Sequence, residues 1–204
     1  MSGTFPSSPV FESLKITSYS PTLTSVSHNL MRQVRTRGSH QWYIEGVFPE
    51  GLSRAQWAPM YAFLVAQRGQ YETFQFTPPY LDDTSGTPLG TPVVDGADQT
   101  GRTVDTTGWT PLSTDLLKAG DFIRFNSMKK VYMVTEDVDS DADGDATISI
   151  EPSLRVSPVN SDAIVYNNVD FTVALTNDKQ VFSLEAPTLF SLEVSMIEVI
   201  DPNG

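Results

Sequence analysis

The chain has 204 residues, of which 39% are hydrophobic, so it can bury the core of one large or two small domains without covalent help. It contains no cysteine, which excludes disulfides, thiolate metal sites and cysteine nucleophiles. The formal net charge of −12 divides into +2 for residues 1–80 and −14 for residues 81–204. Such an acidic second part argues against nucleic acid as a partner, because phosphate neutralisation supplies most of that affinity.

The ends of the chain and its apolar runs give no membrane signal. Residues 1–10 have neither a basic start nor an apolar stretch, and no window approaches eighteen uninterrupted apolar residues. The sequence therefore predicts neither a signal peptide nor a membrane partner, and we expect synthesis in a cytoplasm.

The first segments in chain order are typical of β-strands. Residues 11–19 alternate apolar and polar side chains, residues 25–37 form a mostly polar extended run, and residues 41–48 alternate again. Gly38 supplies a turn signal between the last two runs, so we predict two antiparallel strands that meet there.

One helix is predicted next. Ser53, followed three residues later by Gln56, is typical of a capping box at a helix N-terminus, and Gly69 suits a left-handed cap about four turns later. Pro59 removes one helical donor, so the helix either bends or begins there. A strand over residues 71–77 then completes a β-β-β-α-β unit.

The second half reads as a β-module followed by more strands. Residues 82–115 are rich in Gly, Pro, Asp and Thr and are interpreted as a long loop or the start of an inserted domain. Short strands with turn signals then predict a small antiparallel barrel or sandwich over residues 122–125, 131–134, 146–150 and 163–166. Three further strands are expected at residues 171–175, 181–184 and 192–199.

The order of these elements predicts a host domain with an insertion. The fold class is mainly β with one helix (α+β), in which residues 1–79 and 167–204 form the host and residues 80–166 an acidic β-barrel insertion. The predicted host core consists of Trp42, Ile44, Trp57, Leu64, Phe74 and Phe76.

An Asp-rich segment is the strongest local signal for a ligand. From Asp139 the sequence matches the D-x-D-x-D-G start of a calcium loop, but its twelfth position is Ile150 and Glu151 follows one place late. The same residues suit a solvated β-turn, so both interpretations stay open. The candidate calcium ligands are Asp139, Asp141, Asp143 and Asp145, and no other cofactor is expected.

The sequence offers no catalytic constellation. His28 lies in a polar segment and His40 in a turn, and neither is near a G-x-S-x-G elbow. Acidic residues are abundant, but the sequence does not place two of them as the carboxylate pair that sugar hydrolysis requires. No glycine-rich phosphate loop follows a strand. We therefore expect a binding protein and not an enzyme.

Three segments resemble those of a known family in pattern and order: Arg35 to Gly38 before a strand, then Trp42-x-Ile44-x-Gly46, and a run from Phe63 in the helix to Pro79. In that run Arg68-Gly69 precedes Phe74-x-Phe76-x-Pro78-Pro79. This pattern, over about residues 25–80, resembles the minor tail protein M and distal tail proteins of long-tailed bacteriophages.

The resemblance implies a tail-tube-like β-sandwich with a helix, in a usually hexameric ring of identical subunits at the distal end of the tail. The implied partners are other copies, the tail-tube protein, and a baseplate hub or tail-tip protein, in a virion assembled in the host cytoplasm. A galectin-like or oligosaccharide-binding-like barrel, common in the family, would suit residues 80–166. The C-terminal strands depart from the short family pattern.

Two physical considerations bear on this reading. The polar extended run of residues 25–37 has backbone groups that pairing with a neighbouring subunit would satisfy, and head-to-tail contacts close rings.

As an alternative, Tyr80, Trp109 or Tyr132 could stack on a sugar, which would make the chain a carbohydrate-binding module of a receptor-binding apparatus. A capsid decoration or head-to-tail joining protein also remains open.

Overall fold

The computed structural model describes residues 3–81, 83–185 and 189–200. By packing, the chain divides into two compact units. We call Met1–Phe74 with Val173–Val199 the host unit, and Gln75–Thr172 with Ile200–Gly204 the barrel unit. The boundaries predicted from the sequence, residues 1–79 with 167–204 for the host and 80–166 for the insertion, stay a prediction.

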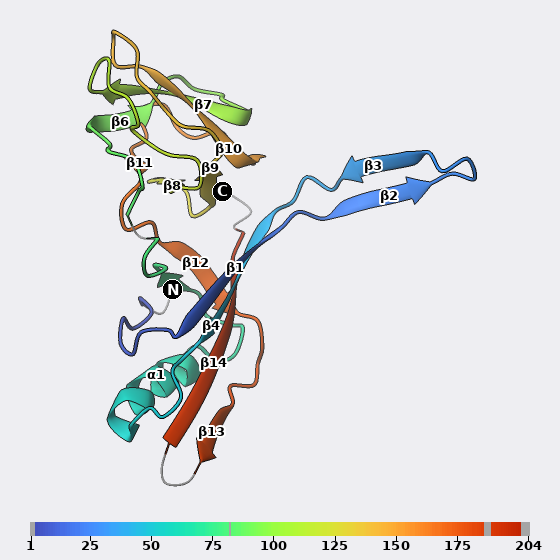
Figure 1. Cartoon of the computed structure of the whole chain (residues 1–204), viewed down its shortest axis with the longest axis vertical. Helices are drawn as coiled ribbons and strands as arrows, with labels where there is room; N and C mark the ends of the chain where they lie inside the picture. Colours follow the sequence, from blue (N-terminus) through green and yellow to red (C-terminus); the bar gives the residue numbers. More distant parts are fainter. Residues whose placement is uncertain (1–2, 82, 186–188, 201–204) are drawn as a thin grey trace. The chain divides into compact units, whose positions relative to one another are not determined.

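The host unit is built on a sheet in which the C-terminal strands lie beside the N-terminal ones. Figure 1 shows its long strands running side by side. Along the sheet the strands are β1 (Ser13–Tyr19), β4 (Gln41–Val47), β14 (Leu189–Glu198), β12 (Phe171–Leu175) and β5 (Phe74–Phe76), with β13 (Phe182–Glu185) paired to β14.

Alternation of side chains explains which face of this sheet is buried. In β4, Trp42 and Ile44 are buried and Glu45 is exposed, and the antiparallel partner β14 buries Val194 and Met196 in the same way. Five of the six predicted host-core residues are buried: Trp42, Ile44, Leu64, Phe74 and Phe76.

The hairpin predicted to turn at Gly38 is wrong in its pairing. Strand β4 pairs with β1, from Ser13↔Val47 to Tyr19↔Gln41, and the polar run folds on itself as β2 (Thr22–Val26) and β3 (Arg32–Thr36). The turn lies between Val26 and Arg32. Gly38, at a φ of 70°, lies in the link between β3 and β4. A glycine in such a link gives the same sequence signal as a glycine in a hairpin turn, so the sequence does not distinguish the two.

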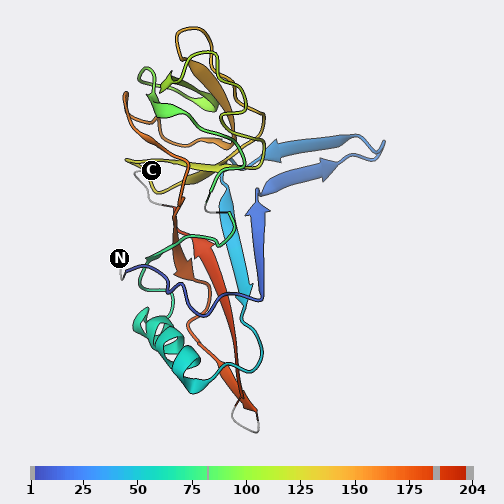
Figure 2. The ribbon, with the colours of Figure 1, turned by 60° about the vertical axis from the view of Figure 1, so that its left-hand side comes forward.

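The helix α1 (Arg54–Ala66) starts where the sequence predicts. The Ser53 backbone N–H donates to Gln56 Oε1 at 3.1 Å, which forms the capping box, and Pro59 lies inside the helix and does not begin it. Met60 and Leu64 are fully buried. The prediction that Trp57 belongs to the buried host core is wrong. Its side chain is only half-buried and stacks on Tyr61, with ring centroids 5.0 Å apart. Figure 2 shows α1 lying on one face of the host sheet.

The barrel unit contains a nearly closed, antiparallel, six-stranded sheet. The strands follow the order β11 (Ile164–Val165), β8 (Phe122–Phe125), β9 (Val131–Val134), β10 (Ala146–Leu154), β7 (Gly101–Trp109) and β6 (Gly90–Val94). A single isolated bridge, Val93↔Ala163, links the two end strands. The predicted inserted barrel is therefore confirmed.

Of the two interpretations of residues 82–115, the structure supports the start of an inserted domain and not a long loop, because the segment contains β6 and β7. In β7, Val104, Thr106 and Trp109 are buried while the residues between them are mostly exposed. Thr106 is a polar residue in the core, where its Oγ1 donates to the Ala146 carbonyl at 2.6 Å and accepts from Trp109 Nε1 at 2.8 Å. These hydrogen bonds make a Thr-rich strand compatible with burial. No helix in the described part of the chain is both long and apolar enough to span a membrane.

Candidate functional site

The host unit carries a two-stranded arm, which we define as residues 20–37. Strands β2 and β3 pair with each other, from Thr22↔Thr36 to Val26↔Arg32, and with no other described strand. Every residue of both strands is exposed. Figure 1 shows the two strands in blue as a separate ribbon that continues the β1–β4 pair. Since an isolated hairpin is marginally stable in water, the arm has the properties of a segment that is completed by a partner.

The end of the arm is a tight turn with an apolar surface. The Ser27 N–H donates to the Met31 carbonyl at 3.0 Å, and the Leu30 N–H donates to the Ser27 carbonyl at 2.9 Å. We call Val26, Leu30 and Met31 the tip cluster; their exposed fractions are 58%, 84% and 61%. The sequence reasoning recognised the free edges of this segment and missed the tip, whose signal is an apolar pair inside a polar run.

The arm is also the basic part of the chain. Arg32, Arg35 and Arg37 lie in it, and residues 20–37 contain no Asp or Glu. The rest of the chain carries −15, because the whole chain carries −12. An arm of +3 on an acidic body favours contact with another acidic surface.

The barrel unit has its own closed core. Fifteen buried residues between Val94 and Ile164 form one cluster, which includes Val104, Ile148 and Tyr132. The Arg124 guanidinium pairs with Asp170 at 2.8 Å, with both side chains less than one-fifth exposed. The core cluster is therefore built entirely from residues of the barrel unit.

The predicted calcium ligands are near each other in sequence, but the carboxylates of two of them, Asp139 and Asp141, have separate partners. Asp139 Oδ1 accepts the Asp115 N–H at 2.8 Å, and Asp141 Oδ1 accepts the N–H groups of Asp143 and Asp145, each at 2.9 Å. Within the described residues, no three His, Asp or Glu side chains gather as a metal-binding group. Calcium at these four positions stays a prediction, which calorimetric titration with calcium checks.

Electrostatics in this loop are those of a hydrogen-bonded turn. The backbone N–H groups of Asp145 and Asp143 lower the pKa of Asp141, and the Ala119 N–H, followed by Lys118, lowers the pKa of Asp137. Lys118 lies between Asp115 and Asp137, whose carboxylates raise its pKa. The fold itself therefore favours the charged form of the Asp137 and Asp141 carboxylates.

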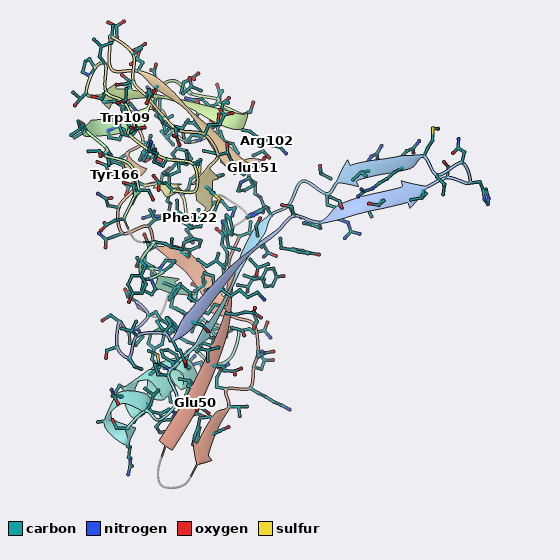
Figure 3. The ribbon with its side chains drawn as sticks, in the orientation of Figure 1. Glu50, Arg102, Trp109, Phe122, Glu151 and Tyr166 are labelled. Atoms are coloured by element: carbon teal, nitrogen blue, oxygen red, sulfur yellow. The ribbon has the colours of Figure 1, made fainter. Side chains whose placement is uncertain are left out.

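The three predicted sugar-stacking residues are in different environments. Trp109 and Tyr132 are core residues, 3% and 1% exposed, so neither offers a ring face to a ligand. Tyr80 is 87% exposed. Sequence reasoning missed Tyr166, which is half-buried. Its ring centroid lies 6.2 Å from that of Trp109. Both residues are labelled in Figure 3.

Tyr166 lines a shallow groove at the seam of the barrel. The groove has a volume of about 370 Å³ and runs between Gly90–Val93 on one side and Ala163–Asn167 on the other. Pro92 lies next to the Val93↔Ala163 bridge and has no N–H to donate across the seam. The ladder between β6 and β11 therefore stops there, which leaves the barrel nearly closed and the groove open.

The comparison with known families shows what this barrel is similar to. Residues 83–169 match the family model of the B domain of the distal tail protein pb9. This segment resembles a phage distal tail domain. All six strands from β6 to β11 lie within the match, which covers less than half of the chain. No curated protein matches the chain.

The B domain confirms the recognition of a phage distal tail family and supports a structural role in a phage tail. The match falls in the barrel unit, whereas the sequence resemblance covers about residues 25–80, most of which belong to the host unit. The distal tail B domain therefore accounts for the barrel, and the arm of the host unit is the feature that it does not explain.

Proposed function

We propose that this chain is a subunit of a homo-oligomeric ring, of about six copies, at the distal end of a phage tail. The ring would join the tail tube to the baseplate or tail tip, so its other partners would be the tail-tube protein and a hub or tip protein. The chain would act by binding and not by catalysis, in a virion assembled in the host cytoplasm.

The observation that carries this proposal is the arm. A two-stranded segment with every strand residue exposed and free outer edges gains little stability from its own chain. Contact with an adjacent subunit would bury its apolar side chains and satisfy its edge groups. Because the arm and the surface it meets would be different patches, the contact is head-to-tail and closes into a ring when the rotation permits.

Removal of the arm tests this proposal. Tyr19 and Gln41 are directly paired, so an Asn-Gly turn can replace residues 20–40, which are the arm together with its link to β4, and close the β1–β4 hairpin. We expect native mass spectrometry and negative-stain microscopy to show closed rings for the natural chain at high concentration and monomers for the shortened one. Both chains should unfold cooperatively. A natural chain that stays monomeric and does not bind the tail-tube protein would count against the ring.

The seam groove favours a second candidate function, binding of a cell-surface carbohydrate by the barrel. Its half-buried Tyr166 ring lies beside Trp109, which is fixed by its hydrogen bond to Thr106. We expect Tyr166→Ala to abolish glycan binding on an array if this function is real. The exposed Tyr80 provides the control, since Tyr80→Ala should leave such binding unchanged.

A further inference from the structure

The tip cluster of the arm is an apolar surface that its own turn does not use. The turn is held by polar groups: Ser27 Oγ is hydrogen-bonded to Asn29 Oδ1 and to the Met31 carbonyl. The side chains of Leu30 and Met31 are 84% and 61% exposed. These two side chains therefore add little to the stability of the arm, and their exposure costs hydration free energy in the free chain.

Leu30 also occupies a backbone conformation that leucine disfavours. Its φ is 64°, in the left-handed region, where glycine and asparagine are the common residues. Asn29, the adjacent residue, does not take this position. In an arm whose strands pair with no other described strand, a strained residue with an apolar, exposed side chain is accounted for when the side chain is needed outside the turn.

Charge indicates which partner the tip meets. Two copies that each carry −12 repel one another on average. The arm, at +3 and without an acidic residue, is attracted to the remainder of a second copy, which carries −15. Association of two copies is therefore favoured when the arm of one copy approaches the acidic surface of the other. The arginines of the arm would accelerate this encounter at low salt.

We infer that the tip cluster is the anchor of the subunit contact: Val26, Leu30 and Met31 insert into an apolar site on a second copy. Arg32, Arg35 and Arg37 steer the approach. This inference rests on the proposed ring and adds the place where its binding energy is concentrated. Interface energy is commonly held by a few desolvated side chains, with charged residues around them setting the association rate.

Leu30→Asn is the decisive variant, because the two roles of Leu30 predict opposite results. Asparagine tolerates the left-handed conformation, so the substitution should leave the thermal stability of the monomer unchanged or raised. It removes the apolar anchor, so we expect the concentration at half-assembly, measured by analytical ultracentrifugation, to rise roughly tenfold to a hundredfold.

Leu112→Asn is the matched control. Leu112 has a φ of 54° and is 76% exposed, but it lies in the barrel unit, where its N–H donates to the Asp141 carbonyl. The same substitution there should leave assembly unchanged. Replacement of Arg32, Arg35 and Arg37 by Gln should slow association by about tenfold and flatten its salt dependence, with little change in dissociation.

The possible outcomes separate this inference from the ring itself. If the natural chain assembles and Leu30→Asn does not, the tip is the anchor. If Leu30→Asn assembles as the natural chain does, the tip inference is overturned and the ring proposal stands. If the natural chain neither self-associates at any accessible concentration nor binds the tail-tube protein, a second copy is not the partner, and both the ring and the inference fall.

Discussion

Asp141 is the residue that most clearly organises its loop. Its carboxylate accepts two backbone N–H groups, from Asp145 and Asp143, and its pKa is lowered from 3.8 for that reason. A carboxyl group whose pKa is lower in the folded state than in the unfolded state stabilises the fold. Its contribution is fully present when the pH is above the pKa of the unfolded state. That stability is lost as the pH falls through the folded pKa.

We therefore expect Asp141→Asn to lower the melting temperature at neutral pH, with the difference from the natural chain disappearing in acid. Differential scanning calorimetry from neutral pH to below pH 3.8 measures both trends. Asp143→Asn is the control, because the Asp143 side chain has no hydrogen bond within the described residues and its replacement should have little effect. Equal melting temperatures for the natural and Asp141→Asn chains at neutral pH would contradict a stabilising role for the hydrogen bonds that the Asp141 carboxylate accepts.

Gly69 is a position where sequence and structure agree on the need for glycine. Its φ is 69°, and an added Cβ would lie 2.8 Å from Asp178 Oδ1 and 3.0 Å from Asp178 Cα. We expect Gly69→Ala to cost roughly 2–4 kcal/mol of unfolding free energy, from left-handed strain and overpacking together. Gly38→Ala has a similar φ of 70° but open space around it, so urea unfolding should show only about 1–2 kcal/mol there.

At the scale of elements, periodicity predicted strands and a helix well where an apolar face was regular. It failed where burial depended on partners distant in sequence. Thr106 is buried because Ala146 and Trp109 satisfy its hydroxyl, and no pattern within residues 82–115 reveals that. The sequence predicts the arm as an extended run with unpaired edges. The turn at residues 27–31 and its apolar tip follow from the pairing register of β2 with β3. That register is not predicted, because the glycine signal at Gly38 points to a turn at the wrong place.

The helix gives a test of the corrected core. Trp57 is half-buried in a cluster with Tyr61 and Phe182, 4.5 Å from the Phe182 ring, whereas Leu64 is fully buried. Trp57→Ala should therefore cost about 2 kcal/mol, below the roughly 3–5 kcal/mol of a fully buried tryptophan. Leu64→Ala should cost about 2–5 kcal/mol. A larger loss for Trp57→Ala than for Leu64→Ala in chemical unfolding would show that the aromatic cluster belongs to the main core.

At the scale of the whole molecule, the chain is a barrel placed within the sequence of a host. The barrel core cluster is drawn entirely from residues between Val94 and Ile164, and the matched B domain spans residues 83–169. The sequence placed this insertion at residues 80–166, whereas packing divides the chain after Phe74 and after Thr172. The two sets of boundaries predict different fragments, so folding experiments can decide between them.

We expect a fragment of residues 75–172 to fold alone and to be more stable than one of residues 80–166, by at least about 3 kcal/mol. The shorter fragment lacks Phe171, which is fully buried with its ring 5.4 Å from Phe122, and Asp170, which neutralises Arg124. Loss of Phe171 exposes apolar surface, and loss of Asp170 leaves a partly buried guanidinium without its counter-charge. Circular dichroism and urea unfolding of both fragments measure the difference, and an Asp170→Asn variant of the longer fragment isolates the ion pair. Equal stabilities would place the domain boundary where the sequence predicted it and assign Phe171 and Asp170 to the host.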